Sequence, residues 1–161
     1  MQSLPNLKKL YMDCNRVSRV SGLYGCSALE ELHLSDQRID PGVSLEFNNG
    51  SLTSIGGSLK VFIAQGNNIT DVRKLVALRE LEEVDFSRNH IDESEGLKEM
   101  FSQCQKLRRL SILGNPICRT SRSIEADAIL TCTLLEEFNN KEVTHQNRKC
   151  IQMMSTRKAK K

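Results

Sequence analysis

The chain has 161 residues, of which 39% are hydrophobic and 27% charged, and its formal net charge is +3. That length fits one domain, and that apolar content is sufficient for the buried core of a soluble globular protein. The N-terminus has no apolar signal-peptide region, and no apolar stretch approaches the length that crosses a bilayer. We therefore expect neither secretion nor membrane insertion, and a cytoplasmic location.

One apolar spacing, L-x-x-L-x-L-x-x-N-x-L, recurs five times along the chain. The copies begin at Leu7, Leu29, Leu59, Leu81 and Leu107, and a degenerate sixth start lies at Leu135. This spacing is the leucine-rich-repeat signature, in which one repeat cannot close its own core and neighbouring repeats must stack. The sequence therefore predicts an α/β solenoid over residues 1–117, with short parallel strands on its concave face and loops and short helices on its convex face.

The ninth position of each repeat is polar in all five copies. Its residues are Asn15, Gln37, Asn67, Asn89 and Asn115. An asparagine amide can both donate and accept hydrogen bonds, so we expect the four asparagines to join backbone groups of adjacent repeats in a structural ladder. Gln37 departs from the pattern just before an enlarged connection, where we expect a local rearrangement.

The steps between repeat starts are 22, 30, 22 and 26 residues, so two connections are enlarged. In the 30-residue step, Pro and Gly residues interrupt two short apolar segments. Val43, Leu45 and Phe47 form the first segment, and Leu52 to Ile55 form the second. We expect an irregular excursion held down by its own apolar side chains.

The 26-residue step contains the stretch "SEGLKEMFSQC". Its apolar residues Leu97, Met100, Phe101 and Cys104 follow helical spacing, which predicts a short helix on the convex face. Cys104 also stands where a repeat core needs a small apolar group. We expect the six cysteines to be reduced thiols, because no C-x-x-C pair is present.

Residues 118–144 are expected to cap the C-terminal end of the array. A helix near 122–132 would lay Ile124, Ala128, Ile129 and Leu130 over the last repeat, with Ser121 or Ser123 as its N-cap. Residues 145–161 carry six Lys or Arg and no acid, which predicts a basic tail, helical or disordered, whose end from 157 onward stays loose. At the other end, Met1 to Ser3 are too short to cover the first repeat, so we expect further repeats upstream or a partner there.

The 22-residue period, the "GNPICR" ending and the "LLEEFNNKEVT" segment resemble the leucine-rich-repeat class of phosphatase 1 regulatory subunits, axonemal dynein light chains and a spliceosomal repeat protein. The segments "LEELHLSDQRIDPGVSLEF" and "LTSIGGSLKVFIAQGNNITDV" look more narrowly like the testis leucine-rich-repeat proteins, of the phosphatase 1 regulatory-subunit type. That match spans about residues 22–150 and includes His33 and Gln37-Arg38. Two departures lie in the cap: Ile124-Glu125 replaces an aromatic-basic pair, and Asn139-Asn140 replaces an Asp-Gly turn, which asparagine can still form.

The resemblance implies a partner such as protein phosphatase 1 or a microtubule or axonemal assembly, and a cytoskeletal location in a cilium, flagellum or centrosome. No R/K-x-V/I-x-F/W phosphatase-docking peptide is present in the chain. The second hypothesis, from the spliceosomal relative, is a ribonucleoprotein adaptor whose basic tail touches RNA. Nucleic acid is otherwise not expected as a partner.

Two columns of side chains beside the second leucine are expected to face solvent on the concave side and to contact the partner. The first column is Tyr11, His33, Ile63, Asp85 and Ser111, and the second is Asp13, Ser35, Gln65, Ser87 and Leu113. Tyr11, Ile63 and Leu113 are the expected apolar anchors, unless they cover one another.

Charged pairs precede the second leucine, and their sign alternates from repeat to repeat. They are Lys8-Lys9, Glu30-Glu31, Lys60-Val61, Glu82-Glu83, Arg108-Arg109 and Glu136-Glu137. Because adjacent strands lie about 4.8 Å apart, we expect a ladder of ion pairs that neutralises itself rather than a patch for nucleic acid.

No catalytic constellation is found in the sequence. His33, His90 and His145 lie in different repeats, with no nucleophile elbow, no H-E-x-x-H motif and no metal-ligand spacing. We therefore expect a non-enzymatic interaction scaffold without cofactor, metal or small-molecule substrate.

Overall fold

The structure is a computed structural model that describes residues 4–158, with side chains up to residue 156. The expectations about Met1 to Ser3 and the loose end of the tail therefore concern residues wholly or largely outside the described part. A sheet of seven strands runs the length of the molecule, in the order β1-β3-β5-β6-β7-β8-β9. These strands are β1 (Lys9–Tyr11), β3 (Glu31–His33), β5 (Val61–Ile63), β6 (Glu83–Asp85), β7 (Arg109–Ser111), β8 (Glu137–Phe138) and β9 (Lys141–Glu142).

The six strands from β1 to β8 in this sheet pair in parallel with one constant register, as the repeat pattern predicts. The second leucine position of each copy lies opposite that of its neighbour, so that Leu32 lies between Leu10 and Phe62. The same alignment continues through Val84 and Leu110. Since successive side chains of a strand point to opposite faces, one face of the sheet is apolar and packs inward along its whole length.

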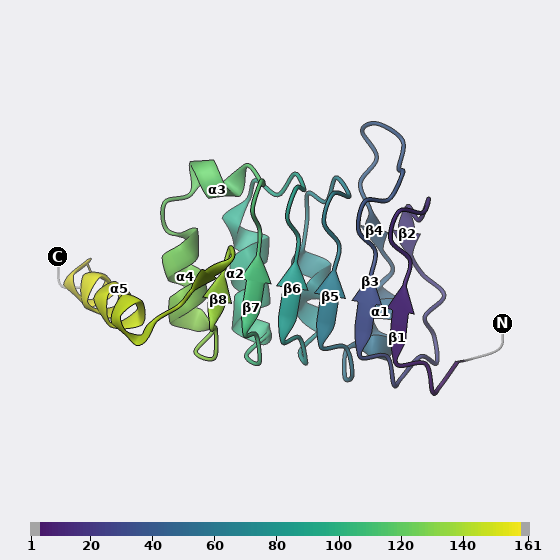
Figure 1. Ribbon diagram of the computed structural model, residues 1–161, viewed down its shortest axis with the longest axis horizontal. Helices are drawn as coiled ribbons and strands as arrows, with labels where there is room; N and C mark the ends of the chain where they lie inside the picture. The colour runs from purple at the N-terminus through teal and green to yellow at the C-terminus, as the bar shows by residue number, and fades with distance from the viewer. Residues whose placement is uncertain (1–3, 159–161) are drawn as a thin grey trace.

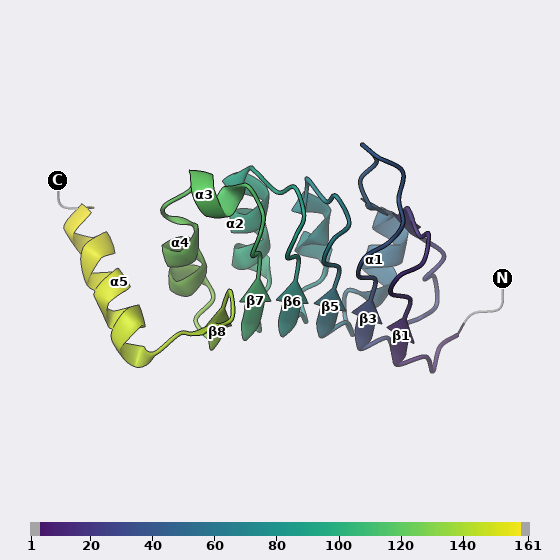
Figure 2. The ribbon, with the colours of Figure 1, turned by 45° about the horizontal axis from the view of Figure 1, so that its top comes forward.

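Helices cover the inward face of the sheet, as Figures 1 and 2 show: α1 (Asn49–Ile55), the 3-10 helix η1 (Arg73–Ala77), α2 (Ser94–Gln103) and α4 (Ile124–Thr131). The short helix α3 (Ile117–Thr120) lies beyond the end of β7. Helices are about 10 Å across, whereas strands repeat every 4.8 Å, so the stack curves with the sheet on its concave side. The predicted convex helix at residues 94–104 is confirmed by α2, whose Leu97, Met100 and Phe101 are buried.

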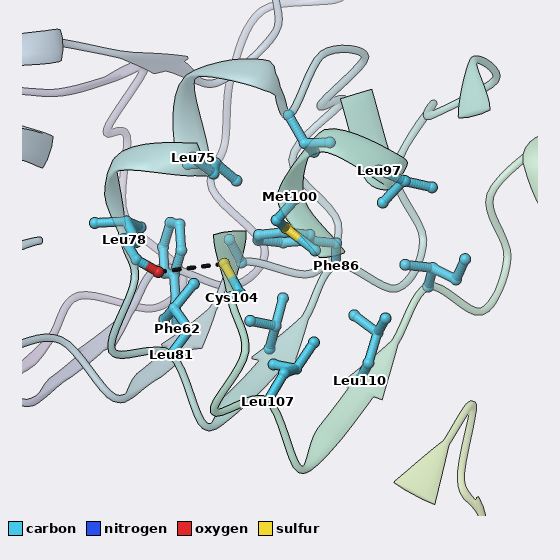
Figure 3. Close-up of a cluster of buried hydrophobic side chains, with 14 of the residues drawn as sticks. Phe62, Leu75, Leu78, Leu81, Phe86, Leu97, Met100, Cys104, Leu107 and Leu110 are labelled. Carbon is cyan, nitrogen blue, oxygen red and sulfur yellow. Dashed lines mark hydrogen bonds between the residues drawn. The ribbon is translucent and has the colours of Figure 1, made fainter. Parts of the chain in front are cut away.

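The core between the sheet and the helices is a continuous apolar column, part of which Figure 3 shows. Phe62 and Phe86 pack edge to face with ring centroids 5.5 Å apart, and Phe47 packs on Phe62 in the same manner at 6.0 Å. Cys104 is fully buried, and its thiol donates to the carbonyl oxygen of Leu78 at 3.3 Å. The cysteine therefore acts as a small core residue, as predicted.

The 30-residue connection is more regular than predicted. Its β4 (Glu46–Phe47) pairs in parallel with β2 (Arg19–Val20) in a second, two-stranded sheet, and α1 follows directly. The side chain of Asn48 accepts a hydrogen bond from the backbone N–H of Ser51 and so caps α1. Asn49 and Gly50, which lie between the two apolar segments of this connection, are thus part of the first turn of a helix.

Only part of the predicted hydrophobic anchoring of this connection is present. Leu45, Phe47, Leu52 and Ile55 are buried, whereas Val43 is exposed. Val43 belongs to the loop between β3 and β4, which projects beyond the other loops in Figure 1. The segment from 39 to 44 is therefore the irregular part of the excursion.

Helix α4 covers the end of the last repeat with the buried side chains of Ile124, Ala128 and Ile129. Leu130 is only half-buried, so it belongs to the helix surface rather than to the covered end. Ser123 precedes the helix, but its hydroxyl donates to the Asp127 carboxylate instead of accepting from a backbone N–H. The predicted serine N-cap is therefore wrong in its hydrogen bonding.

A two-residue hairpin turn follows β8 and returns the chain as β9, the one antiparallel strand among the described residues of the sheet. Its residues Asn139 and Asn140 have φ angles of 52° and 61°. Positive φ at both central positions is the geometry of tight hairpin turns, which asparagine tolerates. The turn predicted at Asn139-Asn140 is therefore present.

Helix α5 (His145–Lys158) extends from the end of the solenoid, beyond α4 (Figures 1 and 2). Arg148 anchors its first half. The guanidinium donates to the carbonyl oxygen of Leu135 at 2.8 Å and to that of Ile129, near the C-terminal end of α4, where a cation is favoured. The basic segment from 145 to 158 is therefore helical.

The first described repeat is less buried than the others. Leu7, Leu10 and Met12 pack against the core but are only partly covered. Strand β1 lies at the end of the sheet and pairs with β3 alone. This edge therefore exposes backbone hydrogen-bonding groups and apolar side chains that are covered in the inner repeats.

Candidate functional site

The ninth-position side chains hold the concave strands in register. Asn89 accepts from the backbone N–H groups of Asn67 and Ile69 at 2.9 and 3.0 Å, and its amide donates to the carbonyl oxygens of Ala64 and Phe86. Asn67 and Asn115 make the corresponding bonds in their own repeats. The result is a buried ladder that fixes the backbone beneath the concave face.

The first two positions of this ladder, Asn15 and Gln37, differ from the sequence expectation. Gln37 takes part fully: its side-chain oxygen accepts from Val17 N–H at 2.9 Å, and its amide donates to the Met12 carbonyl oxygen. No rearrangement is needed there, because the longer glutamine spans the same gap. Asn15 is exposed, and its side-chain amide donates only to the carbonyl oxygens of Met12 and Asp13 within its own repeat.

The N-terminal half of the first concave column is an aromatic cluster. The Tyr11 and His33 rings lie with centroids 4.5 Å apart, and the Tyr11 hydroxyl donates to Glu31 at 2.7 Å. Tyr11 remains 57% exposed, whereas the Nε2 atom of His33 is buried without a hydrogen-bond partner among the described residues. Tyr11 therefore offers a large ring to solvent while its hydroxyl is already held.

The centre of the concave face is aliphatic. Ile63 lies between His33 and Asp85 in the register, and Val61 lies between Glu31 and Glu83. Both β5 side chains are half-buried and flank the inward Phe62. The sequence could have predicted this aliphatic centre, because Val61 is the one uncharged residue among the alternating charged pairs.

The C-terminal half of the first concave column is polar, and part of it is buried. Asp85 accepts from Ser87 N–H at 2.8 Å, and the Ser87 and Ser111 hydroxyls lie 2.7 Å apart. Ser111 is only 8% exposed, so its prediction as a solvent-facing contact residue is wrong. The adjacent serine covers it, and a short side chain at this position does not reach the surface.

The second column is mixed. Asp13 accepts from the backbone N–H of Ser35, and Gln65 accepts from the Arg88 guanidinium at 3.0 Å. Leu113 is 40% exposed, but it follows β7, four strands along the sheet from β1. The predicted anchors Tyr11, Ile63 and Leu113 therefore do not form one patch: Ile63 and the aromatic cluster are continuous, and Leu113 stands about 20 Å from β1.

The alternating charges form the predicted cross-strand ion pairs. Lys9 reaches Glu31 at 2.7 Å, and Glu30 lies between Lys8 at 3.6 Å and Lys60 at 3.3 Å. The remaining pairs are Arg109 with Glu83 and Arg108 with Glu136. Hydrogen bonds from Lys9 and then Tyr11 lower the pKa of the Glu31 carboxyl. These exposed pairs add little stability, but they cancel the charge of the rim.

The histidines and the candidate metal-ligating side chains of the described residues are dispersed. Among residues 4–158, no group of three or more His, Cys, Asp or Glu side chains could hold a metal ion. His33 lies on β3, His90 follows β6, and His145 begins α5, so the three are separated as the sequence indicates. Within the same range, no helix combines the length and the apolar character needed to cross a membrane.

The arrangement of strands, helices and ladder can be compared with known proteins. No family model matches the chain. A chain in the crystal structure of the Drosophila melanogaster SNF/U2A' complex superposes with a TM-score of 0.64 at 16% sequence identity, covering 88% of this chain and 78% of that one. The chain has the leucine-rich-repeat fold. A chain of the Chaetomium Mex67:Mtr2 structure matches less well, with a TM-score of 0.48 at 19% identity, over 62% of this chain and 66% of that one.

Proposed function

We propose that this chain is a non-enzymatic scaffold that binds a protein partner on its concave face. The observation that carries this proposal is the exposed Tyr11 ring, packed on His33 and continuous with Ile63, on strands fixed from below by a buried amide ladder. Rigid aromatic and aliphatic groups of this kind are efficient anchors, because little side-chain freedom is lost when a partner covers them.

The charges around the apolar centre define the partner further. Glu31 and Glu83, which border Val61, are paired with Lys9 and Arg109, whereas Asp85, which borders Ile63, has no ion-pair partner among the described residues. A segment with an apolar anchor and one basic residue beside it would complement this centre. Leu113 and the polar second column, from Asp13 to Ser87, would form the rim of the contact.

Two partner classes follow from likeness to known proteins. The first is protein phosphatase 1 or a ciliary, axonemal or centrosomal assembly, which the testis-type sequence resemblance supports. The second is a ribonucleoprotein complex, which the fold similarity to a chain of the SNF/U2A' complex supports equally well. The first class implies a cytoskeletal location and the second does not, so imaging of the tagged protein separates them.

The concave site can be tested with Ile63→Glu, which places a charge at the aliphatic centre. Val43→Glu is the matched control, because Val43 is an exposed aliphatic residue on the projecting loop. Purified phosphatase 1, polymerised microtubules and the native complexes from cells would be tested as partners. We expect Ile63→Glu to reduce capture at least about tenfold and Val43→Glu to leave it unchanged. Equal capture by both variants would refute the concave site.

A further inference from the structure

Strand β1, at the N-terminal end of the sheet, has an outer edge to which no strand of the described part is bonded (Figure 1). In β3, the N–H groups of Glu30 and Glu31 donate to the Lys8 carbonyl oxygen of the preceding repeat, at 2.7 and 3.0 Å. The register makes the N–H groups of Lys8 and Lys9 their equivalents in β1. These groups point away from β3, so the β1 edge is open to a further strand.

The ladder side chain of the first repeat also lacks a preceding repeat to bond. Each inner ladder side chain bonds to the backbone of the repeat before it. Asn115, for example, accepts from Ile91 N–H at 3.0 Å and donates to the Phe86 carbonyl oxygen at 2.8 Å. The Asn15 amide donates within its own repeat, and its side-chain oxygen accepts no hydrogen bond among the described residues. A parallel segment beside β1 would bring its own N–H groups to this oxygen, as the inner repeats do.

The inward side chains of the first repeat are less covered than those of the next. Leu32 is 1% exposed, whereas Leu10, its register partner in β1, is only partly buried. Leu7 and Met12 are likewise only partly buried, and Leu4 is exposed. The apolar layer beneath the sheet therefore continues to this end of the molecule, and an added strand needs apolar residues at its inward positions.

The charges beside the edge specify the occupant further. The basic pair Arg108-Arg109 lies between the acidic pairs Glu82-Glu83 and Glu136-Glu137 and forms ion pairs with both. The basic pair Lys8-Lys9 has an acidic pair on one side only, Glu30-Glu31, and its two side chains are 69% and 56% exposed. An acidic pair on the open side would complete the arrangement that the chain already shows at its other basic pair.

We propose that the open edge of β1 is a second docking surface, which takes a parallel, acidic β-strand from a protein partner. The strand has two acidic residues followed by alternating inward apolar residues. Its acidic pair would lie opposite Lys8-Lys9, its apolar side chains would cover Leu7 and Leu10, and its backbone would bond to the edge and to Asn15. This surface is the edge of the sheet, so it is separate from the concave face of the proposed function.

A second copy of this chain would not supply such a strand. Two β1 edges related by a two-fold axis pair antiparallel and bring two Lys8-Lys9 pairs together. A head-to-tail copy would have to offer the acidic pair Glu136-Glu137 of β8. The outer edge of β8 is already covered by the antiparallel strand β9. A strand from a different protein is therefore the occupant that fits.

The probe is a fluorescent peptide with the sequence of residues 81–92, LEEVDFSRNHID, because this segment lies in parallel beside Arg108-Arg109 in the folded chain. A matched peptide, LKKVDFSRNHID, carries lysine in place of both glutamates. Fluorescence anisotropy with the whole chain should show at least about tenfold tighter binding of the acidic peptide, and this binding should weaken as salt rises.

Variants of the chain test the groups of the edge one by one. Lys9→Ala removes one cation, and Lys9→Pro also removes the outward N–H, which proline can replace at a sheet edge without loss of the bonds to β3. Lys9→Ala should weaken binding of the acidic peptide about threefold and Lys9→Pro at least about tenfold. Asn15→Ala, which removes the ladder oxygen, should weaken it at least about threefold.

The matched control is Lys141→Ala, because Lys141 is an exposed lysine on β9, the edge strand at the other end of the sheet. It should change the affinity less than about twofold. Ile63→Glu, the variant of the concave site, should bind the peptide as the unchanged chain does, so either proposal can fail without the other. Circular dichroism verifies that each variant is folded.

Four outcomes would overturn the proposal. The first is no measurable binding of the acidic peptide, or equal binding of the two peptides. The second is equal affinity of Lys9→Ala and Lys9→Pro, since the backbone edge would then take no part. The third is a loss in Ile63→Glu as large as that in Lys9→Pro, which would locate the peptide on the concave face. The fourth is self-association of the chain, measured by sedimentation and abolished by Lys9→Pro, which would make a second copy the occupant.

Discussion

Replacing Asn89 by alanine should destabilise the fold more than its small change in volume suggests. The Asn89 side chain is 2% exposed and accepts from the backbone N–H groups of Asn67 and Ile69. Truncation leaves both donors buried without an acceptor, at about 1–3 kcal/mol each. The Phe86 carbonyl oxygen keeps its bond from Asn115, so the acceptor side loses less. We therefore expect the free energy of unfolding to fall by about 2–6 kcal/mol.

The measurement is urea unfolding followed by circular dichroism, with Asn15→Ala as the matched control. Asn15 has the same repeat position and the same amide, but its side chain is exposed and bonds only within its own repeat. Its loss should cost less than about 1 kcal/mol, as surface substitutions do. Equal losses in the two variants, with unchanged m-values, would refute the view that the bonds between repeats carry the stability.

Three further predictions concern the core, the tail and one turn. Burial raises the pKa of the Cys104 thiol to about 12 and that of the Cys132 thiol to about 11, so these thiols ionise at lower pH in the unfolded chain than in the folded one. The free energy of unfolding should therefore keep its full value below about pH 9 and fall as the pH rises towards 11–12. The fall should be less steep in the variant with both cysteines replaced by alanine. Arg148→Ala should release α5 and speed its amide hydrogen exchange, leaving that of the strands unchanged. Gly114→Ala should lower the free energy of unfolding in urea by about 1–2 kcal/mol, because the φ angle at this position is +76°. Gly57→Ala should leave it unchanged, because the added methyl group would have no atom within 4 Å. Equal effects of the two substitutions would contradict this prediction.

The turn after each concave strand shows how far one sequence position can be predicted. The eighth repeat position has a positive φ in every copy, yet only Gly66 and Gly114 are glycines there. Cys14, Asp36 and Arg88 adopt the same conformation. The repeat geometry imposes this turn whatever residue is present, so composition at that position does not reveal it. The leucine spacing around it does.

The repeat period is enough to predict the parts of the molecule in which equivalent residues stack. The six strand positions, the face each side chain takes and the alternating ion pairs follow from a spacing that fixes which residues stack. The burial of Leu97, Met100 and Phe101 follows from helical spacing in the same way. These features need only neighbouring copies of one local pattern, so reading the pattern is sufficient.

Features that depend on one particular neighbour become visible only in the folded chain. Asn49-Gly50 begins a helix because Asn48 caps it, and Ser111 is buried because Ser87 covers it. The Tyr11 ring packs on His33 because the parallel register places residues 22 apart side by side. Arg148 holds α5 because its guanidinium reaches carbonyl oxygens at and just after the end of α4. The strength of each contact depends on distances between side chains remote in sequence. Periodicity carries no information on those distances.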